Sequence, residues 1–185
     1  CASEDLVDGQ MGKAINFDGS NYINLPDGDD FKPDHMTIEV VCKTSTNNSI
    51  WARVFDRYYH SGSSGYAIAI TDTGKGRFHP RVTGGVYTQA DTTNTIEGDG
   101  AWHYLAGSYG NDGKTKMYDD GSLDQQATVD SSNILYHNTS QTPRIGDGVY
   151  DNSYKGSISE LRVSNTARSE SWIKVTSDGL RDELL

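Results

Sequence analysis

A period of two in side-chain polarity recurs along this chain and limits what it can fold into. Near the end of the chain, Leu161 and Val163 alternate with Glu160 and Arg162, which is the spacing of a strand buried on one face. Residues 14–18 repeat the pattern near the beginning. We expect these two strands to lie side by side in one sheet, with the later strand closing it.

The composition favours many short strands. The 185 residues include 20 glycines and 11 tyrosines, and glycine-rich turns between segments rich in Tyr, Thr, Val and Ile indicate strands joined tightly. Asp120 and Gly121 stand between two such segments and predict a hairpin. A dozen short strands without a long helix predict an all-β protein, a β-sandwich or jelly roll of two antiparallel sheets.

One short helix is predicted close to the end of the chain. Ser169 is a suitable N-cap, the helix would reach about Ser177, and Trp172, Ile173 and Val175 would pack back onto the sheet. We expect one domain over residues 1–185, with a lead-in at 1–12 and a tail at 178–185.

Charge and hydropathy exclude two classes of partner. The formal net charge of −10 would repel the phosphates of a nucleic acid. No apolar run is long enough to cross a membrane. The chain does not open with a charged and then apolar leader, so we expect any signal sequence to have been removed or to lie outside this chain. The charge suits a secreted protein, extracellular or at the cell surface, although many cytosolic proteins are equally acidic.

Cysteines and tryptophans point to the core. Cys42 lies in a strand-like run and is interpreted as a buried free thiol. Three interpretations of Cys1 are open: it pairs with Cys42, it carries a lipid, or it marks the end of an excised module. Trp51, Trp102 and Trp172 are interpreted as core residues.

Six segments in order resemble the laminin G-like modules of the concanavalin A-like lectin/glucanase superfamily. They are 12–19 (GKAINFDG), 37–39 (TIE), 101–109 (AWHYLAGSY), 117–121 (MYDDG), 144–146 (RIG) and 160–169 (ELRVSNTARS). The resemblance covers residues 10–177 and implies a concanavalin A-like jelly-roll β-sandwich with one C-terminal helix. Val41 stands where the family carries Trp, and Ser159 stands where many members carry an Asp that would hold calcium.

Catalysis is not expected. Glycan-cleaving enzymes on this fold place two or three carboxylates at alternate positions of one strand, and no predicted strand carries them. No spacing typical of a catalytic triad or a zinc site occurs either.

A structural calcium ion is one hypothesis for the acidic residues. Asp18 ends the first strand, Glu160 lies on the strand expected beside it, and backbone carbonyls such as that of Gly19 would complete an oxygen shell. The alternative is that Asp18 shapes the turn while Glu160 pairs with Arg162 or Lys13.

Two groups are candidates for glycan binding. Arg77, His79 and Arg81 share one face of a predicted strand and form a stripe of cationic or titratable groups suited to a carboxylate or sulfate. Tyr58 and Tyr59 form an aromatic tip that would stack on sugar rings. Alternatively, the cations only balance acidic surroundings and one tyrosine covers the core.

The sequence therefore predicts a non-catalytic carbohydrate-binding or adhesion module of a larger extracellular protein, with a glycan, acidic or neutral, as its ligand. The alternative is a structural protein-interaction module, whose partner would be a protein surface. The position of exposed aromatic rings distinguishes the two.

Overall fold

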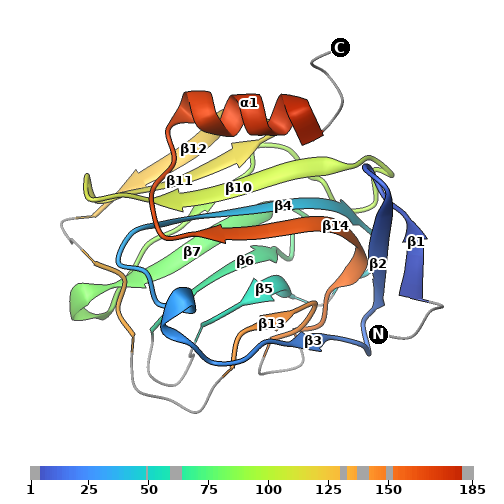
Figure 1. Cartoon of the computed structure of the whole chain (residues 1–185), viewed down its shortest axis with the longest axis horizontal. Coiled ribbons are helices and arrows are strands. Elements are labelled where there is room, and N and C mark those ends of the chain that lie inside the picture. Colours follow the sequence, from blue (N-terminus) through green and yellow to red (C-terminus); the bar gives the residue numbers. More distant parts are fainter. Residues whose placement is uncertain are drawn as a thin grey trace.

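The chain folds into two packed sheets. The structure, a computed structural model, describes residues 5–48, 50–58, 64–129, 133–136, 142–148 and 152–180. Within these ranges there are two seven-stranded antiparallel sheets and one α-helix, which lies on the far side of one sheet (Figure 1). The all-β sandwich predicted from the sequence is confirmed.

Sheet A has the strand order β1-β2-β14-β4-β10-β11-β12. Its strands are β1 (Leu6–Asp8), β2 (Lys13–Asp18), β14 (Lys155–Ser164), β4 (Met36–Thr44), β10 (His103–Tyr109), β11 (Lys114–Asp119) and β12 (Ser122–Thr128). As predicted, strands from the two ends of the chain are neighbours, because Ile158 of β14 lies opposite Ile15 of β2.

Sheet B has the order β3-β13-β5-β6-β7-β8, and a further strand pairs with β7. Its strands are β3 (Ile23–Asn24), β13 (Arg144–Ile145), β5 (Ala52–Asp56), β6 (Tyr66–Ile70), β7 (Gly76–Val82), β8 (Val86–Tyr87) and β9 (Ala90–Asp91). Short 3₁₀ turns occupy Asp29–Phe31 and Thr83–Gly85.

The main core lies between the two sheets, and their close approach limits the size of the side chains. Ile38 and Val40 of β4, Ile68 of β6 and Phe78 of β7 are fully buried there. A Cβ atom on Gly107 of β10 would lie 2.3 Å from the Phe78 ring. Glycine is therefore required at position 107 because the aromatic ring of the opposite sheet occupies that space.

Pro80 accounts for a gap beside β7. It has no N–H to donate to a ladder, and the sequence suggests an edge or a bulge at this point. In the structure, β9 pairs with the Arg77 end of β7 and β8 pairs with the Arg81 end. The two short strands therefore lie on either side of the Pro80 region instead of forming one continuous strand.

The helix α1 (Glu170–Leu180) covers sheet A from outside. Ser169 caps it as predicted, because its Oγ accepts from the backbone N–H of Trp172 at 3.2 Å. Ile173 packs into a second apolar cluster. Trp172 and Val175 do not pack back, since they are 47% and 61% exposed. The helix extends into the predicted tail, and the predicted lead-in contains β1.

The cysteine and tryptophan interpretations have mixed outcomes. Cys42 is a buried free thiol, and burial raises its pKa to about 12, so it is unreactive at neutral pH. Cys1 lies outside the described residues. Trp102 packs partly against the second cluster, while Trp51 contacts an arginine rather than the core. No helix in the described part of the chain is long and apolar enough to span a membrane.

Candidate functional site

Arginines and aromatic rings gather on the outer face of sheet B. Phe78 and Val82 of β7 point into the core, so the intervening Arg77, His79 and Arg81 point outward, as the sequence predicts. We refer to this surface as the arginine face. It consists of Trp51, Arg53, Tyr58, Arg77, His79, Arg81 and Tyr87.

Small residues on the neighbouring strand make room for these long side chains. Ala67 of β6 lies opposite His79, and Ala69 lies opposite Arg77 on one side and Arg53 on the other. Both alanines are fully buried. Because they have only a methyl group, the larger side chains can extend across β6 and contact one another.

Arg81 and two tyrosines form one half of the arginine face. The Nε–H of Arg81 donates to the hydroxyl of Tyr58 at 2.9 Å. Its guanidinium carbon lies 4.6 Å from the ring centre of Tyr87, a cation–π distance. Tyr58 is 6% exposed and Tyr87 is 37% exposed. Tyr87 is therefore the ring that this half offers to solvent.

His79 lies beneath these rings rather than at the surface. It is 2% exposed, and the ring centres of Tyr58 and Tyr87 lie 5.1 and 5.6 Å away. Its Nε2 is hydrogen-bonded to the guanidinium of Arg53. Because arginine can only donate, Nε2 must accept, so the bond requires a neutral imidazole. His79 therefore orders the rings above it and is not a cation presented to a ligand, contrary to the expected stripe.

Arg77 is already paired. Its Nε and Nη2 atoms donate to the two carboxylate oxygens of Asp91 at 2.5 and 2.6 Å, and its guanidinium carbon lies 4.3 Å from the ring centre of Trp51. Burial disfavours the charged guanidinium, but the bond to Asp91 outweighs it and raises the pKa of Arg77. Arg77 consequently holds the half-buried Trp51 ring in position.

Two more ion pairs continue the row across β5 and β13. Arg53 lies 3.7 Å from Asp56, and Arg144 lies 3.2 Å from Asp147. Asp56 is almost completely buried. Burial raises its pKa to about 6, although the Arg53 charge opposes that shift.

The structure thus brings together four of the five residues predicted for glycan binding. Tyr58, Arg77, His79 and Arg81 are in one cluster, while Tyr59 lies outside the described residues. Sequence reasoning missed Tyr87, which follows a Gly-Gly turn in a stretch without clear periodicity. It also misplaced Trp51, whose positive φ of 63° turns the chain just before β5.

The two carboxylates proposed for calcium are far apart. Asp18 lies opposite Lys155, and Glu160 lies five residues further along that strand, roughly 16 Å away at about 3.3 Å per residue. One Asp18 oxygen accepts from the hydroxyl and from the backbone N–H of Ser20, both at 2.7 Å. These hydrogen bonds, the hydroxyl's most of all, lower the pKa of Asp18. Glu160 pairs with an arginine of its own strand at 3.2 Å.

Both of these contacts match the alternative roles that the sequence leaves open, a turn for Asp18 and a surface ion pair for Glu160. Gly19 has a φ of 92° in that turn, a conformation that favours glycine. Calcium binding stays a prediction, and Asp18 and Glu160 cannot share one ion in this arrangement.

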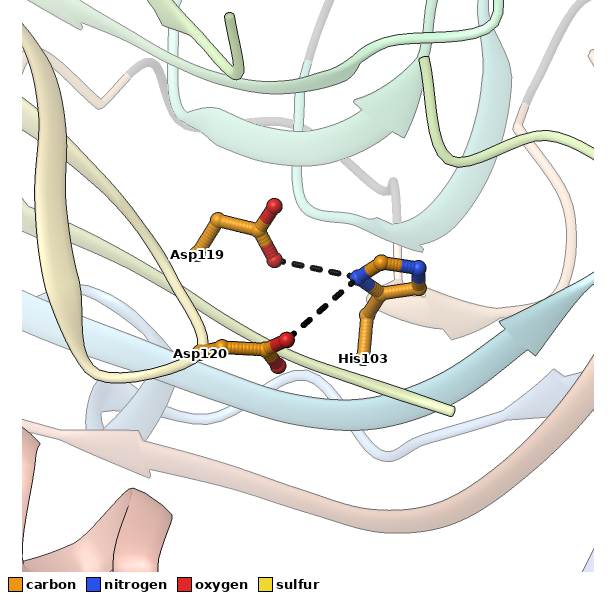
Figure 2. Close-up of side chains that lie close together, drawn as sticks. All are labelled: His103, Asp119 and Asp120. Atoms are coloured by element: carbon orange, nitrogen blue, oxygen red, sulfur yellow. Dashed lines mark hydrogen bonds and ion pairs between the residues drawn. The ribbon is translucent and has the colours of Figure 1, made fainter. Parts of the chain in front are cut away.

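A histidine surrounded by carboxylates lies at the beginning of β10, a central strand of sheet A. The Nδ1 atom of His103 lies 3.1 Å from Asp119 and 3.9 Å from Asp120, as Figure 2 shows. Its Nε2 lies 2.8 Å from Asp99. The bonds to Asp119 and Asp99 raise the pKa of His103 to about 9 against the opposing effect of burial. His103 is therefore an imidazolium at neutral pH that joins the loop before β10 to the β11–β12 turn.

A hollow of about 250 Å³ lies on the outer face of sheet A. The described residues that line it are Gln10, Met11, Val41, Ser159, Glu160, Arg162 and Leu180. None of them is aromatic, so the hollow lacks the ring on which a sugar could stack. The arginine face, in contrast, has the exposed ring of Tyr87 and the half-buried ring of Trp51 beside polar groups.

Comparison with protein families agrees with this architecture. The family model described as the concanavalin A-like lectin/glucanases superfamily matches residues 17–174, which is most of the chain. The chain belongs to this superfamily. The laminin G-like resemblance inferred from the six sequence segments is thereby confirmed.

Solved structures with the same fold include several binding domains. The binding domain of Paraclostridial Mosquitocidal Protein 1 has a TM-score of 0.77 at 13% identity, over 94% of this chain and 45% of that chain. Domain 4 of an extracellular arabinanase from Geobacillus stearothermophilus, in complex with arabinotriose, has a TM-score of 0.71 at 22% identity, over 93% and 80%.

A third similar structure is the CBM40 of the IT-sialidase of Ruminococcus gnavus, bound to α2,3-sialyllactose. Its TM-score is 0.70 at 12% identity, over 89% of this chain and 96% of that chain. The chain thus spans less than half of the mosquitocidal-protein structure and most of the other two. A search of curated proteins found no match to this chain. At these identities the solved structures establish the fold alone.

Proposed function

We propose that this chain is a non-catalytic carbohydrate-binding module that binds glycan on the arginine face. The observation that carries the proposal is the set of rings held there by guanidinium groups. Tyr87 is exposed beside Arg81, and Trp51 is half-buried beside Arg77. A sugar needs an aromatic platform flanked by hydrogen-bond donors, and both are combined on this surface.

The electrostatic state of the carboxylates supports binding without hydrolysis. A glycosidase needs two carboxylates on either side of the glycosidic bond, one as acid and one as base or nucleophile. On the outer face of sheet B, Asp56, Asp91 and Asp147 each face an arginine. Asp91 and Asp147 are held in ion pairs, and Asp56, whose pKa is raised to about 6, is buried beneath the surface, so none of the three is presented to a sugar.

The solved structures add circumstantial support. The arabinanase domain is in complex with arabinotriose and the sialidase CBM40 is bound to a sialyllactose, so this architecture accommodates sugars in other proteins. By the same reasoning, we propose an extracellular module within a larger protein. The alternative, a structural interaction module, stays a prediction.

A glycan array tests the proposal directly. The purified chain should bind at least one class of glycan and should release no reducing ends from the same compounds. Failure to bind any glycan on a broad array, by folded protein, would refute carbohydrate binding. Release of reducing ends would refute the non-catalytic assignment alone.

A further inference from the structure

We propose that Arg81 makes the arginine face selective for glycans that carry a carboxylate. This inference rests on the proposed function, since it names the ligand class of the same surface. It follows from the charge balance of the outer face of sheet B, where one of four arginines differs from the other three.

Three of these arginines already face a carboxylate. The pairs are Arg53 with Asp56 at 3.7 Å, Arg77 with Asp91 at 2.5 Å, and Arg144 with Asp147 at 3.2 Å. Arg81 has no carboxylate partner within the described ranges. Because the protein carries a net charge of −10, an arginine without such a partner is a local exception, and its charge is available to a bound anion.

The hydrogen bonds of Arg81 leave part of its guanidinium open. Its Nε donates to Tyr58 and its Nη1 donates to the carbonyl of Gly85 at 3.0 Å. A guanidinium has five N–H donors, so three remain, on Nη1 and Nη2. These two atoms form the end of the planar fork that matches both oxygens of a carboxylate. The two bonds already made hold the fork in place, so little side-chain freedom is lost on binding.

The free donors of Arg81 lie where they would favour a carboxylate attached to a sugar over a free anion. The Arg81 guanidinium lies against the ring of Tyr87, and Tyr87 is the most exposed tyrosine of the arginine face. A sugar ring in contact with Tyr87 therefore lies beside the fork. A carboxylate attached to that sugar, as in a uronic or sialic acid, can reach Nη1 and Nη2 while the ring keeps its aromatic contact.

The test compares each acidic sugar with its own methyl ester, which keeps the ring and removes the charge. The probes are oligogalacturonate, a glucuronate-containing oligosaccharide and a sialyllactose, each with its ester and the corresponding neutral sugar. We expect an acid to bind about ten- to a hundredfold tighter than its ester, the range for a hydrogen-bonded ion pair. Added salt should reduce this ratio.

Two variants isolate the residue. Arg81→Gln should bring the acid-to-ester ratio close to one, and Arg81→Lys should restore only part of it, because lysine keeps the charge without the fork. Arg162→Gln is the matched control. It removes the same charge from an exposed arginine on sheet A that already pairs with Glu160, and it should leave the ratio within about twofold, as expected for a distant exposed charge. Melting temperatures verify that each variant is folded.

The outcomes separate this inference from the proposed function. Equal binding of acid and ester to the wild type would overturn the inference and leave carbohydrate binding intact. An acid preference that survives Arg81→Gln would assign the carboxylate to another cation and also overturn it. If no acid, ester or neutral sugar binds, the proposed function fails, and the inference fails with it.

Discussion

Both sheets are built from strands of alternating polarity, but their outer faces differ in what covers them. On sheet A, the outward residues Val41, Tyr104 and Tyr118 are covered by Ile173 of α1. On sheet B, the described residues provide no helix, and the outward positions of β7 carry Arg77 and Arg81 against aromatic rings. The helix-covered face stabilises the fold, and the uncovered face is the one that we propose binds the ligand.

The polar groups of the two faces also differ in their access to solvent. On sheet A, the buried Tyr104 hydroxyl donates to Glu39 at 2.5 Å, and burial with this bond raises the pKa of Tyr104. The arrangement is closed, since neither side chain reaches solvent. On the arginine face, Tyr87 remains exposed and Arg81 keeps unused donors. Mutations that separate stability from binding should follow this division.

The largest expected effect is on sheet A. Ile173→Ala removes the fully buried helix side chain from its cluster and should lower the free energy of unfolding by about 2–4 kcal/mol. Denaturant titration measures the loss. Glycan affinity at temperatures where the variant is folded should be unchanged, and a parallel loss of affinity would break the division between the faces.

His103→Gln should destabilise the protein in a pH-dependent way. The folded pKa of about 9 lies above the ordinary value of 6.5, so the stabilisation by His103 is fully present below pH 6.5 and is lost as pH rises through 9. The wild type should exceed the variant by on the order of 2–3 kcal/mol at pH 6. That difference should shrink toward pH 10. A stability difference that stays constant across this pH range would contradict the ion pairs of His103 with Asp99 and Asp119.

Asp56→Asn should show a pH dependence of the same direction on sheet B, but at lower pH. The folded pKa of about 6 lies above the ordinary value of 3.8, so the folded state binds a proton more tightly and wild-type stability falls as pH rises from about 4 to 6. Between pH 4 and pH 7, the stability difference should move by about 2 kcal/mol in favour of the variant. If the free energies of unfolding of the two proteins change with pH in parallel, the pKa of Asp56 is not raised in the folded state.

The smallest expected effect concerns calcium. Since Asp18 accepts from Ser20 and lies far from Glu160, Asp18→Asn should keep the turn through its amide oxygen and melt close to the wild type. A chelator and added calcium should shift the two melting curves equally, because any calcium bound elsewhere would not involve Asp18. If calcium raises the wild-type melting temperature and the variant loses that response, Asp18 ligates an ion after all.

The sequence predicts the strands and their faces better than it predicts register. The period of two placed Arg77, His79 and Arg81 on one face, and the structure agrees. Adjacency of the first and last strands was also predicted, but the pairing of Lys155 with Asp18 leaves Glu160 beyond the contact. Side-chain polarity repeats every second residue, so it fixes the face but leaves shifts of two or four residues undecided.

Burial and long-range clusters were harder to predict. His79 is buried beneath Tyr58, two residues after β5, and Tyr87 of β8, and no local pattern specifies these contacts. The His103 cluster could have been found, since the β10–β11 turn pairs Leu105 with Asp119 and so brings the end of β11 close to His103. The register of this hairpin, and not a sequence motif, would have predicted the contact between His103 and Asp119.

A matched pair of exposed aromatic residues tests the central claim most directly. Tyr87 on sheet B and Trp172 on α1 are 37% and 47% exposed, and each has an arginine guanidinium 4.6 or 4.3 Å from its ring centre. For a glycan identified on the array, calorimetric titration should show at least about tenfold weaker binding by Tyr87→Ala, equivalent to about 1.4 kcal/mol. Trp172→Ala should bind like the wild type. Loss of affinity in Trp172→Ala with Tyr87→Ala unaffected would place the binding surface on the helix side and contradict the account.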